Sequence, residues 1–499
     1  MMGRIAREVS MRRRRSILLV LPLALLTLQG CSPSLSRDQD LDRALLSIRS
    51  DDIYDTCRTI ASVRFSGRLT GHEGYTEAAR WAADRFREWT LKPLDEKTGY
   101  LRPYPSPYTI VDKAEMAMIT SRMENGSLKE TVRPFETGKD FLPCFFSDSG
   151  QNTADVVFVG WGISAPDLAY DDYTGMDVRG KFVLCLKGSP RAGDLRFDDY
   201  NHLFHRVGNA VEKGALGLLI VAPEPQANPS ALWKQGYSHA VLGEKTADAI
   251  LSENGTTCAE LRARLTAAGK PLSMNLKARI RYAVASRHFP DGIGYNIAAY
   301  CEGSDPGMKR ECVIIGAHLD ACGLHMGFHY PGADDNASGC AVVLEVAKAF
   351  SKLARKPRRP VLFVLFGGEE MRIQGSEHFA GETLPPFDRT DGMINLDMVG
   401  EGDGLNCSYS PDTLDMKGLI EKADSDLKIL RKIAPIEGLS FVSDHLPFMR
   451  KGITCVQISS NGPHFGYHQT GDTIYRINPE IMTDCARLIF KAGFSWADR

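Results

Sequence analysis

Short apolar runs bounded by glycine or polar residues recur along the chain, and such runs predict buried strands of a parallel sheet. From about residue 290 onward they alternate with helical patterns. A helix is predicted from about Ser338, and a C-terminal helix from Asn478-Pro479, an N-cap followed by proline at the first helical position. The predicted strands lie at 312–317, 361–366, 393–396 and about 453–459. This alternation predicts an α/β fold with a mostly parallel, mixed central sheet flanked by helices.

The chain before residue 290 has a different character. Apolar residues at helical spacing predict a helix over 76–89, and the prolines of 98–110 predict a loop or an edge strand. Further on, short apolar runs predict strands, but no cluster of metal-ligand side chains follows them. These runs lie at 156–160, 181–185 and 216–221. We therefore predict an inserted β-rich domain at 140–285, which separates a main domain into residues 32–139 and 286–499.

The composition describes an ordinary soluble globular protein. The 499 residues are enough for two or three domains, with 43% hydrophobic and 24% charged residues. The 60 Lys and Arg nearly balance the 62 Asp and Glu, which gives a formal net charge of −2. This balance gives no reason to expect nucleic acid as a partner. The sequence leaves the oligomeric state open.

The first 31 residues predict a secretory signal peptide. A basic cluster at 12–15 precedes an apolar stretch at 16–28, which is shorter than the about 20 residues of a membrane-spanning helix. The segment Leu-Gln-Gly-Cys that ends at Cys31 resembles a bacterial lipobox. It implies export and a lipid anchor on Cys31 as the sole membrane attachment, and Ser32 favours the outer membrane, facing the periplasm or the cell surface. A signal peptide cut elsewhere and an uncleaved anchor are the alternatives.

Cysteine usage predicts neither a thiolate zinc site nor a redox motif, because no Cys-x-x-Cys pair occurs among the 12 cysteines. Several cysteines, such as Cys185 and Cys455, lie inside apolar runs and are predicted to be small core residues. The sequence assigns no disulfide.

Acidic residues and histidines follow the predicted strands at separate points of the chain: His318, Asp335, the pair Glu369 and Glu370, Asp397, and His468. Functional groups of parallel sheets gather outside the carboxyl ends of the strands. Imidazole and carboxylate groups gathered there predict a metal site. Each residue alone has an ordinary structural explanation, such as a helix start or a surface loop. Their joint occurrence in one strand–helix alternation favours the metal site.

The motifs around these residues resemble those of the co-catalytic di-zinc exopeptidases, the family of secreted bacterial leucyl aminopeptidases, aminopeptidase Y and glutamate carboxypeptidase. They are Gly-Ala-His-Leu-Asp at 316–320, Gly-Ala-Asp-Asp-Asn-Ala-Ser-Gly at 332–339, Gly-Glu-Glu at 368–370, Asn-Leu-Asp-Met-Val-Gly at 395–400 and Tyr-His-x-x-x-Asp-Thr at 467–473. The resemblance covers about 290–499 well and 55–110 loosely. The insert resembles a protease-associated domain, so residues 32–139 and 286–499 are predicted to form the zinc peptidase domain.

The resemblance implies a role for each residue and two Zn²⁺ ions per chain. His318, Asp335 and Asp397 would bind one zinc, and Asp335, Glu370 and His468 the other, so that Asp335 bridges and the peptide bond after it is cis. Asp320 would hydrogen-bond His318 and fix its tautomer. Glu369 would be the general base for a water held between the metals. His325 and His329 are predicted to be exposed loop histidines, and Asp444 and His445 are assigned no metal role.

The function predicted from this resemblance is an exported, zinc-dependent aminopeptidase that acts on peptides. Three alternatives remain. A carboxypeptidase or another amidohydrolase would use the same di-zinc site, a receptor-like homologue would have lost catalysis, and an acyl transferase resembling glutaminyl cyclase would use one zinc. Because all the ligand positions and the base are present, the catalytic di-zinc interpretation is favoured.

Overall fold

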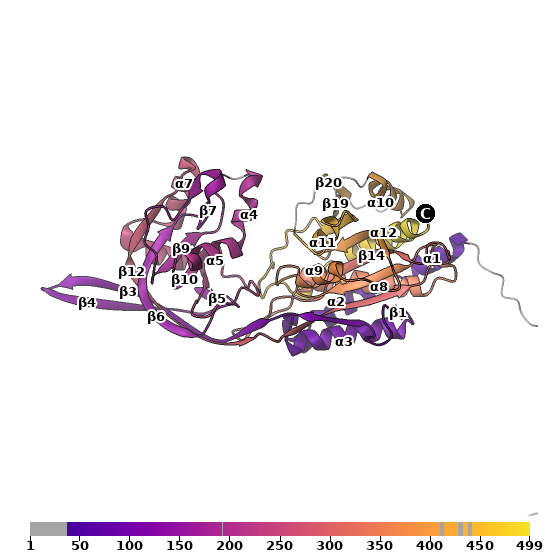
Figure 1. The fold of residues 1–499 in the computed structure, drawn as a ribbon, viewed down its shortest axis with the longest axis horizontal. Helices are drawn as coiled ribbons and strands as arrows, with labels where there is room; N and C mark the ends of the chain where they lie inside the picture. The colour runs from indigo at the N-terminus through magenta and orange to yellow at the C-terminus, as the bar shows by residue number, and fades with distance from the viewer. Residues whose placement is uncertain (1–36, 192, 410–413, 428–432, 438–441) are drawn as a thin grey trace, which may run out of the picture.

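The computed structural model describes residues 37–191, 193–409, 414–427, 433–437 and 442–499. They form two bodies side by side, each built on one large sheet (Figure 1). We call them the first-sheet body and the second-sheet body. The predicted signal peptide, with Cys31, lies outside the described residues. Among the described helices, none is long and apolar enough to cross a bilayer.

The first sheet has nine strands in the order β1-β13-β17-β14-β18-β21-β19-β20, with β2 paired to β13. Its centre is parallel, from β17 through β14 and β18 to β21, whereas β13 and β19 pair antiparallel with their neighbours β17 and β21. The strands are β1 (Lys92–Pro93), β2 (Leu101–Pro105), β13 (Ile293–Cys301), β14 (Glu311–His318), β17 (Val361–Phe366), β18 (Arg389–Leu396), β19 (Leu405–Tyr409), β20 (Ile433–Glu437) and β21 (Thr454–Ser460). The predicted mixed α/β sheet is confirmed.

Helices cover both faces of this sheet, because successive residues of its buried strands enter different cores. Val313, Ile315 and Ala317 of β14 pack in one core, and Cys312 and Ile314 pack in the other. The first core is closed by helices that include α2, α3, α8 and α12, and the second by α9 and α11. The helices of this body are α1 (Arg37–Leu46), α2 (Ser50–Ile60), α3 (Glu73–Glu88), α8 (Gly339–Ser351), α9 (Gln374–Gly381), α10 (Leu414–Leu427), α11 (Leu446–Met449) and α12 (Pro479–Ala497).

Local signals in the sequence fix several of these boundaries. Asn478 caps α12 by accepting the Glu480 N–H, as predicted. The helix predicted at 76–89 begins three residues earlier, at Glu73, because the His72 side chain accepts the Gly74 N–H and caps it. In the stretch 98–110, β2 forms the predicted edge strand and pairs with β13.

The second sheet has eight strands in the order β4-β3-β12-β6-β9-β10-β11-β5, and its strands from β6 to β11 are parallel. The strands are β3 (Tyr108–Glu124), β4 (Ser127–Phe135), β5 (Phe141–Pro143), β6 (Gly150–Val159), β9 (Phe182–Leu186), β10 (Gly217–Ala222), β11 (Ala240–Gly243) and β12 (Ser273–Phe289). Helices α4 (Asp198–Asn201), α5 (Leu203–Glu212), α6 (Glu244–Leu251) and α7 (Cys258–Ala268) belong to this body. The sheet therefore includes β3 and β4, which precede residue 140. The division into domains and the protease-associated character of the insert stay predictions.

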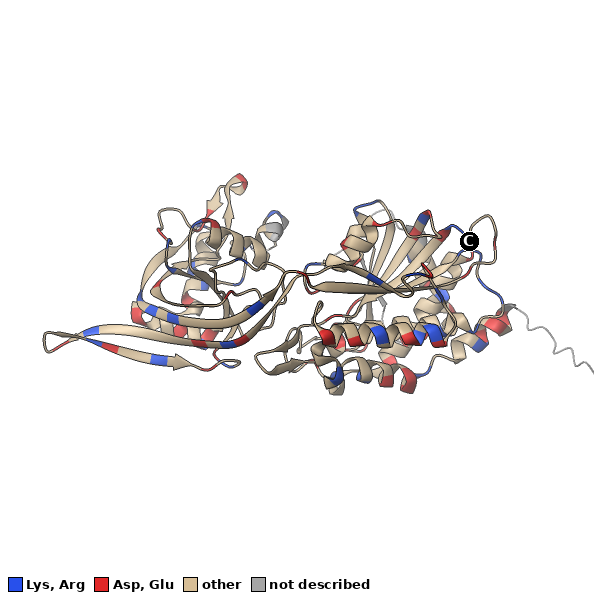
Figure 2. Ribbon diagram, turned by 60° about the horizontal axis from the view of Figure 1, so that its bottom comes forward, with Lys and Arg blue, Asp and Glu red and all other residues tan. Residues whose placement is uncertain are grey.

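Long antiparallel strands connect the two bodies. β3 and β12 each have 17 residues and run from the second sheet toward the first-sheet body, where they lead to β2 and β13 (Figure 1). Lys and Arg positions are interspersed with Asp and Glu positions over both bodies in Figure 2. The cysteines from Cys57 to Cys485 are all free and buried, which confirms the small core residues predicted at Cys185 and Cys455.

Candidate metal centre

The candidate ligands gather where four neighbouring parallel strands end. His318 is the last residue of β14, Asp397 directly follows β18, and Glu369 and Glu370 follow β17 after two glycines. The strand order β17-β14-β18 places these three ends side by side. His468 arrives on the loop after β21, and Asp335 lies just before α8. The fold thus brings all five predicted ligand positions to one edge of the sheet.

Two groups of ligand atoms form there, and Asp335 lies between them. His318 Nε2 is 3.2 Å from Asp335 Oδ1 and 3.3 Å from Asp397 Oδ1. His468 Nε2 is 2.9 Å from Glu370 Oε2 and 3.5 Å from Asp335 Oδ2. Each oxygen of Asp335 therefore faces a different histidine, which is the arrangement that a bridging carboxylate needs.

The sequence interpretation missed one member of the second group. Cys322 lies with Glu370 and His468, and one ligand atom from each lies within 4.8 Å of the others. The Cys322 thiol donates to the Ala227 carbonyl at 3.8 Å and to Glu370 Oε1 at 3.9 Å. Its place two residues after the His-Leu-Asp motif is the signal in the sequence that could have found it.

The structure separates Asp335 from its neighbour Asp334. The Asp334 carboxylate lies 2.5 Å from His464 Nδ1 and accepts the Gly400 N–H at 2.7 Å, so it is held away from the ligand groups. Asp472 orients the turn, because its carboxylate accepts the backbone N–H groups of Asp334 at 2.8 Å and Asp335 at 3.0 Å. The cis peptide bond predicted after Asp335 is present. Asp335, not Asp334, is therefore the residue that reaches both histidines.

Asp320 hydrogen-bonds His318, as predicted, but through its main-chain carbonyl. His318 Nδ1 lies 3.2 Å from the backbone carbonyl of Asp320 and 3.6 Å from its carboxylate. The carboxylate instead accepts the N–H groups of Glu369 and Glu370, both at 3.2 Å. Asp320 thus orients His318 mainly through its main chain, and its side chain fixes the turn that carries the two glutamates.

Buried negative charge dominates this centre. Burial, reinforced by Asp397 and Asp444, raises the pKa of Glu369 well above its usual value, and burial also raises the pKa of Glu370. Burial acts to raise the pKa of Asp397, but His318 beside it outweighs burial and holds the pKa of that carboxyl below its usual value. Among the described residues, no Lys or Arg forms an ion pair with Asp335, Glu369, Glu370 or Asp397. Buried carboxylates that have histidines beside them but no Lys or Arg partner are costly, so this cluster favours a bound cation.

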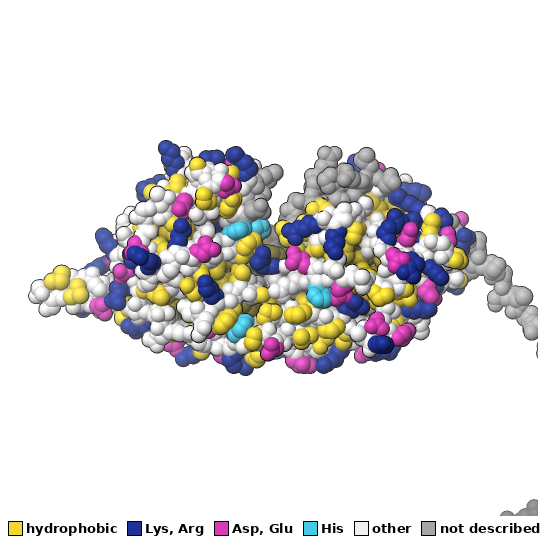
Figure 3. Space-filling view, in the orientation of Figure 1, with side chains coloured by type: hydrophobic (Ala, Val, Ile, Leu, Met, Phe, Trp, Pro, Cys, Tyr) yellow, Lys and Arg dark blue, Asp and Glu magenta, His cyan; other side chains and the backbone are white. Residues whose placement is uncertain are grey.

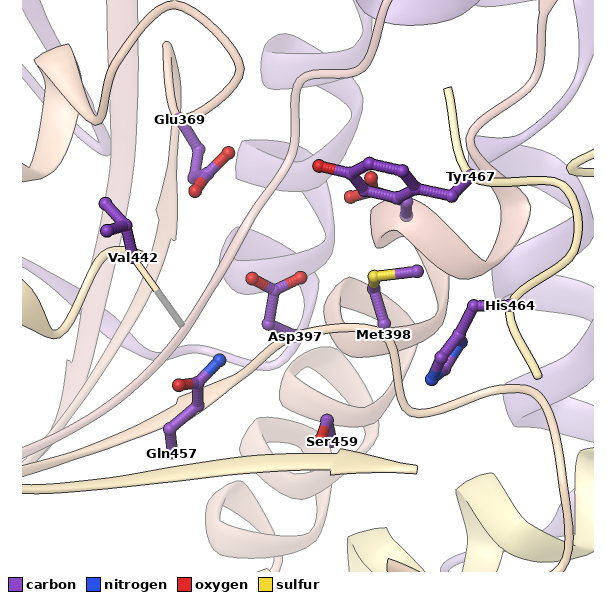
Figure 4. A pocket seen from close by; sticks show the side chains of 9 residues that line it. Glu369, Asp397, Met398, Val442, Gln457, Ser459, His464 and Tyr467 are labelled. Atoms are coloured by element: carbon purple, nitrogen blue, oxygen red, sulfur yellow. The ribbon is translucent and has the colours of Figure 1, made fainter. Parts of the chain in front are cut away.

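A cavity of about 350 Å³ opens beside these groups, and Figure 4 shows Glu369 and Asp397 on its wall. Its other lining residues are Asp335, Met398, Val442, Gln457, Ser459, His464 and Tyr467. The Tyr467 ring stacks on His468 with ring centroids 3.9 Å apart. The sequence signalled Tyr467 only as the residue before His468, and it did not signal Val442, Gln457 or Ser459, because their roles depend on which loops meet at the cavity.

His325 corrects our prediction of an exposed loop histidine. It is 1% exposed, and its Nε2 donates to the Pro143 carbonyl of the second-sheet body at 2.7 Å. Its ring stacks on Phe145 at 3.9 Å between ring centroids. His329, also predicted to be exposed, is partly buried. His325 thus joins the two bodies.

The segment 443–445 lies beneath the first ligand group. The Ser443 hydroxyl donates to Asp397 Oδ2 at 2.7 Å and accepts from the Asn395 amide at 2.9 Å. Asp444 and His445 are fully buried and belong to neither of the two ligand groups of the described residues. Ser443 is therefore the residue of this segment that orients a ligand.

The chain is similar to known peptidases in sequence and fold. The profile of peptidase family M28 matches residues 296–493, the segment that holds all the ligand positions. An aminopeptidase of Pseudomonas aeruginosa is 29% identical over 417 residues, covering 79% of this chain and 67% of that protein. A probable glutamate carboxypeptidase of Arthroderma benhamiae is 23% identical over 479 residues, covering 80% of this chain, which spans only 63% of that protein's length.

The same fold is found in a solved structure. The aminopeptidase from Aneurinibacillus sp. strain AM-1 superposes with a TM-score of 0.63 at 22% identity, covering 92% of this chain and 96% of that one. At this identity the likeness supports the fold alone, including the presence of both bodies.

Proposed function

We propose that the protein is a zinc-dependent aminopeptidase that hydrolyses the first peptide bond of its substrates, because residues 296–493 match peptidase family M28. One observation carries the proposal. Asp335 directs one carboxylate oxygen to His318 and the other to His468, within a cluster of buried carboxylates that has no Lys or Arg partner among the described residues. The cluster is thus arranged to hold two neighbouring cations.

The donor set fits zinc, which binds imidazole nitrogen and carboxylate oxygen. His318, Asp335 and Asp397 would hold one ion, and Asp335, Glu370 and His468 the other. Zinc bound there would supply Lewis acidity, which lowers the pKa of a water and stabilises negative charge on the scissile carbonyl oxygen. Asp320 and Ser443 contribute by fixing the glutamate turn and Asp397, respectively.

Glu369 is the proposed general base. Asp320 fixes the backbone of Glu369. The Glu369 carboxylate faces the cavity next to Asp397 (Figure 4). In this position it can accept a proton from the attacking water and deliver that proton to the leaving amine. Burial raises the pKa of the Glu369 carboxyl, which favours the first of these transfers, acceptance of the proton from the water.

The lining of the cavity favours attack at the amino end of a peptide. It includes Asp335, Glu369 and Asp397 with apolar groups of Met398 and Val442, and no Lys or Arg is among its described lining residues. Zinc ions would offset the charge of their ligands, but a terminal carboxylate would still lack the Lys or Arg partner that a carboxypeptidase site needs. This observation supports the aminopeptidase over the carboxypeptidase alternative. Peptides blocked at the amino end should resist hydrolysis, and peptides blocked at the carboxyl end should be cleaved.

The direct test is Glu369→Gln, with Glu377→Gln on the exposed surface of α9 as the matched control. Loss of the base should lower kcat on an aminoacyl anilide by about 10²- to 10⁴-fold while zinc content stays near two ions per chain. The control should keep both. A fully active Glu369→Gln enzyme, or a wild-type protein whose turnover survives removal of its metal by a chelator, would refute the proposal.

Export with a lipid anchor on Cys31 is part of this proposal and is supported by the leader sequence alone, which lies outside the described residues. Cells given labelled palmitate should label the wild-type protein and not Cys31→Ala. An unlabelled wild-type protein would remove the anchor from the proposal without touching the chemistry of the site.

A further inference from the structure

A loop of the second-sheet body reaches the metal centre of the first. It follows β10 and runs through residues 223–229, Pro-Glu-Pro-Gln-Ala-Asn-Pro, in which three prolines limit the backbone freedom of the loop. Ala227, 1% exposed, donates its N–H to the His468 carbonyl at 3.1 Å. Its own carbonyl accepts from the Cys322 thiol at 3.8 Å. The loop therefore contacts both sides of the second ligand group.

Asn228 in this loop faces the far nitrogen of the His468 ring. The Asn228 Nδ2 donates to the Gln226 carbonyl at 3.2 Å. Because a carbonyl only accepts, this contact assigns the nitrogen of the amide to that side and the oxygen to the other. The oxygen Oδ1 then lies 3.4 Å from His468 Nδ1. An acceptor at Nδ1 selects the tautomer with the proton there, which leaves the Nε2 lone pair directed at Glu370 and Asp335. Asn228 thus favours the tautomer that can bind a metal.

His468 needs this support because its backbone is unfavourable on its own. Its φ of +55° lies in the left-handed region, which a residue with a β-carbon adopts at a cost. The Ala227 N–H holds its carbonyl, and Tyr467 stacks on its ring. The contact of His325 with Pro143 joins the two bodies independently. In the view of Figure 3 the surface is hollowed between the two bodies.

We propose that Asn228 is a positioning residue for His468, and that the loop after β10 completes the metal half-site of Glu370 and His468. The inference rests on the proposed function of the same centre. Asn228 acts through the histidine and touches neither the substrate nor the reacting atoms. The second-sheet body is consequently part of the metal centre, although none of the proposed ligands belongs to it.

The test compares zinc affinities of full-length wild type, Asn228→Ala, Asn228→Asp and the control Asn152→Ala, by competition with a chromophoric chelator. Asn152 lies on β6 of the same body and is partly buried, as Asn228 is. Asn228→Ala should lower the affinity for one of the two zinc ions by about 10- to 100-fold and leave the affinity for the other unchanged. Its kcat should fall at limiting zinc and recover in excess zinc, with KM unchanged. The control should match wild type.

Asn228→Asp keeps an acceptor at the same place, so it should bind zinc at least as tightly as wild type, and it decides the matter if Asn228→Ala does not fold. Equal zinc affinities in Asn228→Ala and wild type would overturn the inference, as would an Asn228→Asp protein that binds zinc tenfold more weakly. A wild-type protein that binds no zinc would refute the proposed function itself, which separates the two failures.

Discussion

Each of the two sheets of this protein contains four neighbouring parallel strands. The residues that follow these strands differ between the two sheets. In the first sheet, the strands lead to His318, to Glu369 and Glu370, to Asp397 and, after a longer loop, to His468. In the second sheet, the residues directly after β6, β9, β10 and β11 are Gly160, Lys187, Pro223 and Glu244. The first set supplies carboxylates and imidazoles, and the second supplies no such cluster.

This difference shows that a parallel sheet provides a place where side chains converge, while residue type decides the chemistry. The second sheet contributes to the centre in another way. Its loop after β10 offers a backbone N–H and an amide oxygen, which orient a ligand that belongs to the first sheet. One body holds the proposed metal ligands, and the other supports one of them.

The largest contrast should come from residues at equivalent strand ends. His318→Ala removes a proposed ligand, so we expect one zinc ion to be lost and kcat to fall by about 10³-fold or more. Glu244→Gln changes a side chain directly after β11 that pairs with Arg262, and it should alter kcat by less than about threefold. Zinc analysis and anilide hydrolysis measure both. Similar losses in the two variants would contradict the division of roles.

A core substitution in the second sheet should lower stability without changing catalysis. Leu184 of β9 is 0% exposed, so Leu184→Ala should lower the free energy of unfolding by about 2–5 kcal/mol through a cavity in the second sheet. Because this core is remote from the ligands, kcat measured well below the unfolding transition should stay near wild type. Denaturant unfolding and steady-state kinetics test this. A tenfold lower kcat would mean that packing in the second sheet reaches the centre.

The second-sheet body should lose stability in acid through His239. This histidine is fully buried and its Nδ1 accepts the Leu218 N–H at 3.0 Å; burial lowers its pKa from 6.5 to about 3. Since the unfolded chain takes up a proton below about pH 6.5 and the folded chain does not, stability is complete above that pH and falls as pH drops toward 3.

The loss from His239 should be about 2 kcal/mol at pH 5. His239→Asn keeps an acceptor for Leu218 without titrating. The difference in unfolding free energy between the variant and wild type should therefore change with pH by this amount between pH 7 and 5. A difference that does not vary with pH would show that His239 does not titrate on unfolding.

The smallest expected effect concerns Cys322, which stands next to the second ligand group. In the structure its thiol donates to carbonyl and carboxylate oxygens, and a hydroxyl can do the same. Loss of a group that orients a metal ligand weakens metal affinity by about tenfold or more. Cys322→Ser should therefore change zinc affinity by less than this. Chelator competition gives the answer. A larger loss would make Cys322 itself a zinc ligand.

The sequence alone predicted most of the first sheet and the positions of the proposed ligands. Apolar runs place β14, β17, β18 and β21 within a few residues, because strand periodicity and strand ends are local properties of the chain. His318, Asp397 and the glutamate pair could be found because they stand directly at those ends. Asp335 could be chosen over Asp334 only through the resemblance to a family motif, since both carboxylates share one turn.

Tertiary structure decided what depends on distant segments meeting. It turned the Asp320 carboxylate to the N–H groups of Glu369 and Glu370, buried His325 against Pro143, and brought Asn228 to His468 across 240 residues of chain. No local pattern encodes these contacts, because each forms only when segments far apart in the chain pack against one another. The sequence thus determined which groups could bind a cation, and the packing of the two bodies determined how those groups are held.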